Sequence, residues 1–275
     1  MPEFSGELKK MRVVHEEPVD YSFRLGLLEV PMNPLIGREI TLTHTGKIDC
    51  IGCGRTIKKS YQQGYCFPCT QTLAECDMCI LRPERCHYHL GTCRQPSWGE
   101  KHCMQGHYVY LANSSGLKVG ITRQTQLPTR WIDQGATQAL PILRVSSRLQ
   151  SGLFETAIKQ DMGDRTDWRK MLRGEAESLD LESIRDQVFE EQADCFDSIA
   201  SQFGRDAFEI LEEEPVRGFT FPVQNYPDKI RSLNLDKTPR IEGVLQGIKG
   251  QYLIFDTGVI NIRKYTGYEV ALSYA

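Results

Sequence analysis

The stretch YVYLANSSGLKVGITR, residues 108–123, predicts two short strands joined by a tight turn. Its outer parts are rich in aromatic and β-branched side chains. The linker between them, residues 112–116, is small and polar and ends in glycine, which suits a hairpin loop. The first arm carries Tyr108 and Tyr110, and the second carries Lys118. A hairpin with such side chains is a candidate part of an active site as well as of a core.

The composition of the 275 residues is that of an ordinary water-soluble protein, with 40% hydrophobic and 25% charged residues. No apolar run approaches the ~20 residues that a membrane-spanning helix needs. The N-terminus lacks the apolar stretch of a secretory signal. We therefore expect a cytoplasmic protein that does not contact membranes, with room for one large domain or about two to three small ones.

The charge is distributed unevenly along the chain, although the net value is only -3. Residues 180–214 contain twelve Asp and Glu against two Arg, a local charge of -10. Residues 101–174 contain eleven Lys and Arg against five Asp and Glu, a local charge of +6. A basic central unit beside an acidic segment is typical of a nucleic-acid-binding protein with one solvated face.

The ten cysteines are clustered, since nine of them lie between residues 50 and 103. In a cytoplasmic protein such clustering indicates metal binding more readily than disulfides. The first group has the spacing C-x2-C-x12-C-x2-C, and its members are Cys50, Cys53, Cys66 and Cys69. Two such knuckles joined by a hairpin can bring four thiolates to one ion. This group therefore predicts a structural zinc site with no open coordination position.

A second group of potential ligands follows, and it is too large for one tetrahedral site, so we expect about two Zn2+ per chain. Its members are Cys76, Cys79, Cys86, His87, His89, Cys93, Cys103 and His107. Cys76 and Cys79 form the obvious knuckle. The residues to complete it are Cys86 and Cys93 as the first choice, with His89 and Cys103 as alternatives. Cys195, far along the chain, should be dispensable for zinc.

Local patterns predict the elements around these motifs. We expect short strands over residues 1–49, a short helix after Pro128 and a strand over 142–145. A helix should follow over 151–162, with Ser151 as its cap, and then one long amphipathic helix over 180–203. From Pro239 onward we expect short strands separated by glycines, as in a small barrel. The two β-rich ends are separate units or, alternatively, parts of one composite domain.

The order of hairpin, helix, strand and helix resembles the GIY-YIG nuclease superfamily. That family has a tyrosine-bearing strand, a second strand ending in Tyr-Ile-Gly, an arginine on the next helix and a metal-binding glutamate on a later one. YVY and KVGITR match the two strands, Arg130 in LPTRW matches the arginine, and Glu155 in LFETAIK matches the glutamate. The phrases CHYHLGTCRQPSWGE, YLANSSGLKVGITR and RWIDQGA resemble more closely an uncharacterised bacterial family with Cys-x2-Cys knuckles ahead of such a core. The nuclease-like part covers about residues 105–174.

This resemblance implies a metal-dependent endonuclease that cleaves phosphodiester bonds of DNA or RNA. Glu155 would hold a divalent metal, Mg2+ or Mn2+, that neutralises the phosphate, and Arg130 would bind phosphate oxygens. Tyr110 would orient or deprotonate the attacking water, given a lowered pKa. Lys118 stands where the family has its second tyrosine, and it joins Arg123 and Arg130 as a candidate nucleic-acid-binding residue.

A lysine does not reproduce a phenol, so a second function stays open: a catalytically inactive, zinc-containing nucleic-acid-binding protein with the same core. The predicted fold class is α+β, with zinc-ribbon-like knuckles followed by a small GIY-YIG-like α/β core and flanked by β-rich N- and C-terminal segments. The expected domains are a β-rich segment (1–49), a zinc-binding region with two sites (50–104), the GIY-YIG-like core (105–178), an acidic amphipathic helical region (179–214) and a β-rich C-terminal small barrel (215–275).

Overall fold

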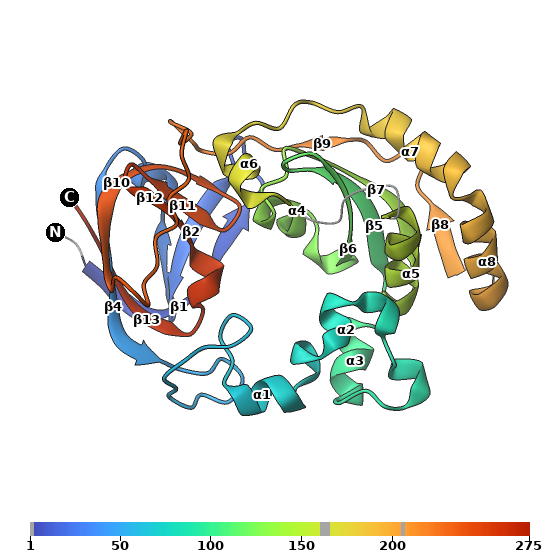
Figure 1. Ribbon diagram of the computed structural model, residues 1–275, viewed down its shortest axis with the longest axis horizontal. Coiled ribbons are helices and arrows are strands. Elements are labelled where there is room, and N and C mark those ends of the chain that lie inside the picture. The colour runs from blue at the N-terminus through green and yellow to red at the C-terminus, as the bar shows by residue number, and fades with distance from the viewer. Residues whose placement is uncertain (1–2, 160–165, 205–206) are drawn as a thin grey trace.

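Two antiparallel sheets and a cysteine-rich region make up this α+β protein, whose computed structural model describes residues 3–159, 166–204 and 207–275 (Figure 1). The larger sheet has eight strands in the order β12-β11-β10-β4-β13-β1-β2-β3. Their bounds are β1 Glu3–Val14, β2 Asp20–Leu25, β3 Leu28–Pro31, β4 Glu39–Ile48, β10 Arg240–Lys249, β11 Tyr252–Phe255, β12 Gly258–Asn261 and β13 Tyr268–Tyr274. The short turn η1 (Asn33–Leu35) leads into β4.

The two β-rich ends of the chain share this one sheet. Strand β4 from the N-terminal part pairs with both β10 and β13, and β13 pairs in turn with β1. The C-terminal strands therefore do not form the separate small barrel expected for residues 215–275, because their neighbours in the sheet come from the other end of the chain. Alternating side chains of β2 are buried in a shared core that includes Tyr21, Phe23 and Leu25.

The smaller sheet contains the predicted hairpin, which is confirmed. Strand β5 (His107–Asn113) pairs with β6 (Leu117–Arg123), and Tyr110 lies opposite Gly120. The order is β6-β5-β7-β8, with β9 paired to β7, where β7 is Gln138–Val145, β8 is Phe208–Ile210 and β9 is Arg217–Gly218. Among these described strands, β6 lies at the edge of the sheet, so one side of it is not covered by a neighbouring strand.

The two faces of the smaller sheet pack against different partners because strand side chains alternate. On one face Tyr110 and Ala112 join the core of the larger sheet, together with α4 (Thr129–Asp133). On the other face Val109 and Leu111 are covered by α5 (Arg148–Ile158), α7 (Leu181–Glu191) and α8 (Ala193–Phe203). The short helix α6 (Trp168–Arg173) packs against β11 and β12 of the larger sheet.

Two helix predictions need correction. The helix expected from residue 151 begins at Arg148, because the Ser147 side chain, rather than that of Ser151, accepts the capping hydrogen bond from Gln150. The end of that prediction, residues 160–162, lies outside the described residues. The single helix expected over 180–203 is two helices, since the chain leaves helical geometry at Gln192 (φ -106°, ψ 12°). Splitting the segment lets both apolar faces reach the same core.

The cysteine-rich region connects the end of the larger sheet to the smaller one (Figure 1). Its elements are α1 (Phe67–Thr72), η2 (Ala74–Cys76), α2 (Met78–Leu81), η3 (Pro83–Arg85), η4 (Tyr88–Leu90) and α3 (Pro96–His102). The cysteines dominate its small buried clusters. The region docks on α5 at Gly152, where an added Cβ would lie only 2.3 Å from the backbone nitrogen of Glu84.

Two short 3-10 helices flank strands of the two sheets: η5 (Gln124–Gln126) follows β6, and η7 (Ile262–Tyr265) precedes β13. Within the described parts of the chain, no helix has both the length and the apolar character needed to cross a membrane.

Candidate metal centre and cationic cavity

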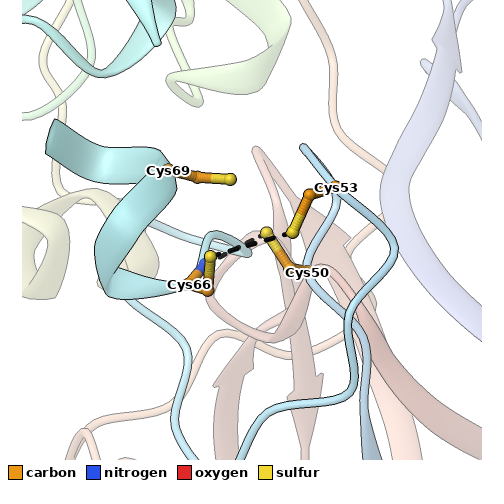
Figure 2. Close-up of side chains that lie close together, drawn as sticks. All are labelled: Cys50, Cys53, Cys66 and Cys69. Carbon is orange, nitrogen blue, oxygen red and sulfur yellow. Dashed lines mark hydrogen bonds between the residues drawn. The ribbon is translucent and has the colours of Figure 1, made fainter. Parts of the chain in front are cut away.

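Four cysteines at the start of the cysteine-rich region point their sulfur atoms toward a common centre (Figure 2). Cys50 and Cys53 come from the loop after β4, and Cys66 and Cys69 come from the start of α1. All four Sγ atoms lie within 4.8 Å of one another. The spacing predicted this cluster, and the structure confirms that these four side chains converge.

The geometry of this cluster is compatible with a structural zinc site. A tetrahedron of Zn–S bonds of ~2.3 Å places its sulfur atoms about 3.8 Å apart, and the Sγ atoms of Cys53 and Cys66 are 3.8 Å apart. Burial disfavours the Cys50 thiolate, but hydrogen bonds from the backbone of Cys66, Cys53 and Gly52 outweigh that effect and lower the pKa of Cys50 to about 6. A preformed thiolate is the form that binds metal.

A second set of cysteines surrounds a cavity of about 10 Å3, close to the space that one water molecule or ion requires. Its members are Cys79, Cys86, Cys93 and Cys103. The thiols of Cys86 and Cys103 hydrogen-bond to each other. This hydrogen bond is the main reason why the pKa of Cys86 is lowered to about 6. Cys103, predicted only as an alternative ligand, therefore belongs to this set.

Cys76 and His89 do not line this second cavity. The extended backbone at Asp77 (φ -66°, ψ 154°) separates Cys76 at the end of η2 from Cys79 in α2, and Cys76 lies instead near Cys50 and Cys66 of the first cluster. His89 is exposed on η4. The expected knuckle of Cys76 and Cys79 is therefore not formed, because the two side chains face different clusters.

Three other candidates have separate surroundings. His87 lies at the rim of the second cavity, where its ring, the Cys79 sulfur and an Asp77 oxygen are within 4.8 Å of one another. His107 is buried in β5 and its pKa is lowered to about 4 by desolvation, so it is a neutral core residue. Cys195 lies on α8 against the core of the smaller sheet.

A larger cavity, of about 380 Å3, lies along the edge strand β6. Its walls come from three parts of the chain: the smaller sheet with α4 and α5, the cysteine-rich region at α2 and η3, and the larger sheet's unit at β1 and η7. Its charged side chains are Lys10, Lys118, Arg123, Arg130, Arg148 and Arg263, together with Asp133 and Glu155. With six cations against two carboxylates, the lining carries a net positive charge, which is complementary to an anion.

Every side chain predicted from the sequence as catalytic or nucleic-acid-binding lines this cavity. Tyr110 comes from β5, Lys118 and Arg123 from β6, Arg130 from α4 and Glu155 from α5. Five residues spread over 45 positions of sequence thus meet in one place. The fold therefore brings together residues that the sequence placed on four different elements.

Tyr110 is fully buried, and this corrects one expectation about it. Burial raises the pKa of its phenol, and the opposing effects of the Arg130 charge and of hydrogen bonds from Gln134 and Arg130 do not reverse that rise. Nε2 of Gln134 donates to the Tyr110 hydroxyl at 2.9 Å. The lowered pKa that a general base needs is therefore absent, and Tyr110 is suited to orient a neighbour by hydrogen bonding.

The Tyr110 ring lies across Gly120 of the neighbouring strand. A Cβ built on Gly120 would be 2.7 Å from both the Cζ and Oη atoms of the tyrosine, closer than such atoms approach in folded proteins. The glycine in KVGITR is therefore required for space. Its presence lets the phenol reach the cavity beyond β6.

We expect Gly120→Ala to lower the free energy of unfolding by about 1–3 kcal/mol, because the added methyl group must displace the Tyr110 ring. Urea denaturation measures this. Gly218→Ala is the matched control, because its Cβ would meet only the Thr137 carbonyl oxygen at 4.0 Å. Equal unfolding free energies for Gly120→Ala and wild type would show that the ring does not occupy this position.

Lys118 and Arg148 are held in place by neighbouring parts of the chain. Lys118 is 5% exposed, and its Nζ donates to the Thr166 hydroxyl at 2.7 Å. Arg148 donates to the carbonyl of Ile80 at 2.7 Å and to that of Cys79 at 3.3 Å, so it joins α5 to the cysteine-rich region. The cavity wall at α2 thus depends on the same fold that holds the second set of cysteines.

Most residues that line this cavity lie in a part of the chain that matches a known protein family. Residues 37–270 match the model of a family described as proteins of unknown function, DUF2797. The chain belongs to the DUF2797 family. The match begins before β4 and ends in β13, so the unit that defines DUF2797 contains both cysteine clusters and every lining residue of the large cavity except Lys10. No curated protein and no solved structure matches this DUF2797 chain.

Four charged residues of the DUF2797 cavity were missed by reasoning from the sequence. Arg148 precedes Glu155 by seven residues on α5, a spacing that puts both on one helix face and could have identified it. Asp133 follows Arg130 on α4 by three residues, and it pairs with Lys10 of β1. Lys10 and Arg263 carry no local signal, because they come from opposite ends of the chain.

Proposed function

We propose that this DUF2797 protein is a metal-dependent endonuclease of GIY-YIG type that cleaves phosphodiester bonds in DNA or RNA. The observation that carries the proposal is that Tyr110, Arg130 and Glu155, which match that superfamily by sequence, line one strongly cationic cavity. Lys118, at the position of the superfamily's second tyrosine, lines it as well. Phosphodiester cleavage requires stabilisation of negative charge on phosphate oxygens, and fixed cations in a partly enclosed site supply it.

The roles follow from the chemistry of each side chain. Arg130 offers a planar, permanently charged group that can contact two phosphate oxygens at once. Lys118 supplies a second, compact positive charge from the edge strand. Tyr110, with its raised pKa, keeps its proton and orients a neighbouring group, so it does not serve as the base.

Glu155 is the residue that would hold the divalent metal. It stands at the position of the superfamily's metal-binding glutamate. Asp133, the other carboxylate in the cavity, pairs with Lys10 and accepts a hydrogen bond from Gln251 at 2.9 Å. One carboxylate, with water and substrate phosphate oxygens as further ligands, suits Mg2+ or Mn2+. When bound, the metal would neutralise the phosphate and stabilise the leaving oxygen. The surplus of cations favours binding of metal together with substrate.

We also propose two structural zinc ions per chain. The first would be bound by Cys50, Cys53, Cys66 and Cys69. The second would be bound by the cysteines around the smaller cavity, and the support for it is that four thiols, two of them already hydrogen-bonded, surround a space of ionic size. Asp77 is a poorer ligand there, because it caps α2 and pairs with Arg94 at 2.6 Å.

The alternative function is nucleic-acid binding without catalysis. Two observations favour it: Lys118 replaces a phenol of the superfamily, and Tyr110 is buried with a raised pKa. Such a protein would use the same six cations to bind phosphates, and its affinity would fall with rising salt through counterion release.

The test is cleavage of labelled DNA and RNA, single-stranded and duplex, in Mg2+ or Mn2+. We expect cleavage by the wild type and a loss of at least about a hundredfold in Glu155→Gln, which removes charge without changing shape. Glu209→Gln is the matched control, because Glu209 pairs with Arg144 on the exposed part of β7 and β8. Undiminished cleavage in Glu155→Gln would refute the site. Salt-sensitive binding without any cleavage would establish the alternative.

A further inference from the structure

The first cysteine module, residues 50–73, has a surface charge of one sign. It contains Arg55, Lys58 and Lys59 and no Asp or Glu. All three cations are exposed, and no side-chain ion pair to an acidic residue is present for them in the described structure. A loop whose exposed Lys and Arg side chains have no Asp or Glu among them is complementary to a polyanion.

Two aromatic rings stand out on the same module. Tyr61 is 37% exposed and Phe67 is 57% exposed, and their ring centroids are 5.8 Å apart in an edge-on arrangement. The Lys59 ammonium lies 5.2 Å from the centroid of the Tyr61 ring. We call Tyr61, Phe67 and Lys59 the aromatic platform. Exposed rings flanked by cations are the arrangement that proteins use to stack unpaired bases.

The aromatic platform is connected to the cationic cavity by a short series of neighbours. Tyr61 pairs with Tyr65 through backbone hydrogen bonds, with Tyr61 N donating to Tyr65 O at 2.8 Å. Tyr65 is near Arg263, and Arg263 is near enough to Arg130 for their charges to repel. Arg263 and Arg130 both line the cavity. In Figure 1 the light-blue loops of the module lie between the sheet and α1.

Arg263 lies between the aromatic platform and the cationic cavity. It comes from η7, shortly before β13, and the carboxylate of Asp133 in the same cavity attracts its charge. Burial lowers the pKa of its guanidinium, and the nearby Arg130 lowers it further. A phosphate between Arg263 and Arg130 would remove this repulsion.

We propose that the aromatic platform binds the bases of an unpaired nucleic-acid strand whose backbone passes Arg263 into the cationic cavity. This inference rests on the proposed function for what happens to the strand inside the cavity. It adds the substrate class: single-stranded rather than duplex nucleic acid. Base faces are available for stacking only in unpaired strands, and a cavity of about 380 Å3 has room for one strand more readily than for a double helix.

A protein partner fits the same surface less well. The exposed cations of the module would be buried without matching acids, unless the partner were itself strongly acidic, and burying unpaired charges is costly. A strand of nucleic acid supplies both the phosphates and the ring faces. The observations therefore favour nucleic acid as the occupant.

The test measures binding apart from cleavage. Fluorescence anisotropy of the full-length, zinc-loaded Glu155→Gln protein without divalent catalytic metal is recorded with a labelled 20-nucleotide strand, as DNA and as RNA, and with the matching duplex. We expect at least about tenfold tighter binding of the single strand. Tyr61→Ala and Phe67→Ala should each weaken single-strand binding by about fivefold to a hundredfold and change duplex binding less than about twofold.

Controls separate stacking from damage to the module. Tyr61→Phe keeps the ring and should bind like the parent, and Leu27→Ala removes a side chain that is 99% exposed on the β2–β3 turn, away from the module. Zinc content measured on each variant reports an intact cysteine cluster. Equal affinity for strand and duplex, or single-strand affinity unchanged in Tyr61→Ala with zinc retained, overturns the inference. Single-strand binding through the platform with no cleavage in wild type leaves it standing and refutes the endonuclease proposal instead.

Discussion

Cys66→Ser should unfold the first cysteine module and release one zinc ion per chain. The substitution removes one of the four proposed zinc ligands, whose sulfur atoms lie within 4.8 Å of one another. Within the part of the chain that the structure describes, the apolar side chains that pack into this cluster besides the cysteines are Ile57, Tyr65 and Leu73, and all three are partly exposed. With so little apolar core, zinc binding would supply nearly the whole of the local folding free energy; the apparent binding free energy in small zinc-finger peptides is about 10–16 kcal/mol.

The larger sheet should survive this change. Its core includes more than twenty buried apolar side chains and does not involve the metal ligands. Limited proteolysis should therefore cut within residues 50–103 of Cys66→Ser, or of wild type treated with a strong chelator, while β1–β4 and β10–β13 stay protected. Elemental analysis of zinc in the intact protein gives the metal count.

Three cysteine variants serve as comparisons for the second ion. Cys195→Ser should keep both zinc ions, because Cys195 packs on α8 against a different core. Cys103→Ser should lose the second ion, since Cys103 lines the smaller cavity, and Cys76→Ser should retain it, since Cys76 does not. Wild-type protein purified without chelator and free of zinc would refute both sites; a single zinc would refute the second.

The features that depend on residues close together in the sequence could be predicted from spacing alone. Two residues between cysteines place both sulfur atoms in one knuckle, so the first cluster follows from the sequence alone. The hairpin of β5 and β6 follows from alternation and from the glycine-ended linker. Arg130 and Glu155 were singled out because the sequence resembles a superfamily whose signature places an arginine and a glutamate on two successive helices. Their meeting in one cavity is consistent with that signature.

What depends on distant packing could not be found in this way. Nothing in the pattern of β4 tells that its partners are β10 and β13, roughly two hundred residues later, because many alternating strands would fit equally well. Lys10 and Arg263 enter the cavity only through that pairing. The raised pKa of Tyr110 has the same origin, since the burial that causes it depends on the packing of the smaller sheet against the larger one.

The division of the second cysteine group was missed for a more local reason. Cys76 and Cys79 have the spacing of a knuckle, but the capping role of Asp77 turns the chain between them. Asp followed by a helix-forming segment is a recognisable N-cap signal. The spacing of two cysteines should therefore be interpreted together with the identity of the two residues between them.

Arg130→Ala should reduce cleavage by about a hundredfold to a thousandfold, the cost of removing one preorganised charge from a site where negative charge develops. Arg130 is on α4, near enough to the Tyr110 hydroxyl to hydrogen-bond with it, and it faces the cavity shared with Glu155. Arg130→Lys should recover only part of the loss, because an ammonium group cannot contact two phosphate oxygens in the planar arrangement of a guanidinium.

The matched control is Arg144→Ala, which removes the same charge from an exposed position of β7 paired with Glu209. Binding gives an independent readout: the slope of log affinity against log salt should fall by about one in Arg130→Ala, as one phosphate contact is lost. An unchanged slope would mean that Arg130 contacts no phosphate, and cleavage unaffected in Arg130→Ala would remove it from the site. A reduced slope without measurable cleavage in wild type would instead assign the cavity to binding alone, since the same guanidinium would then contact a phosphate that is held but not cut.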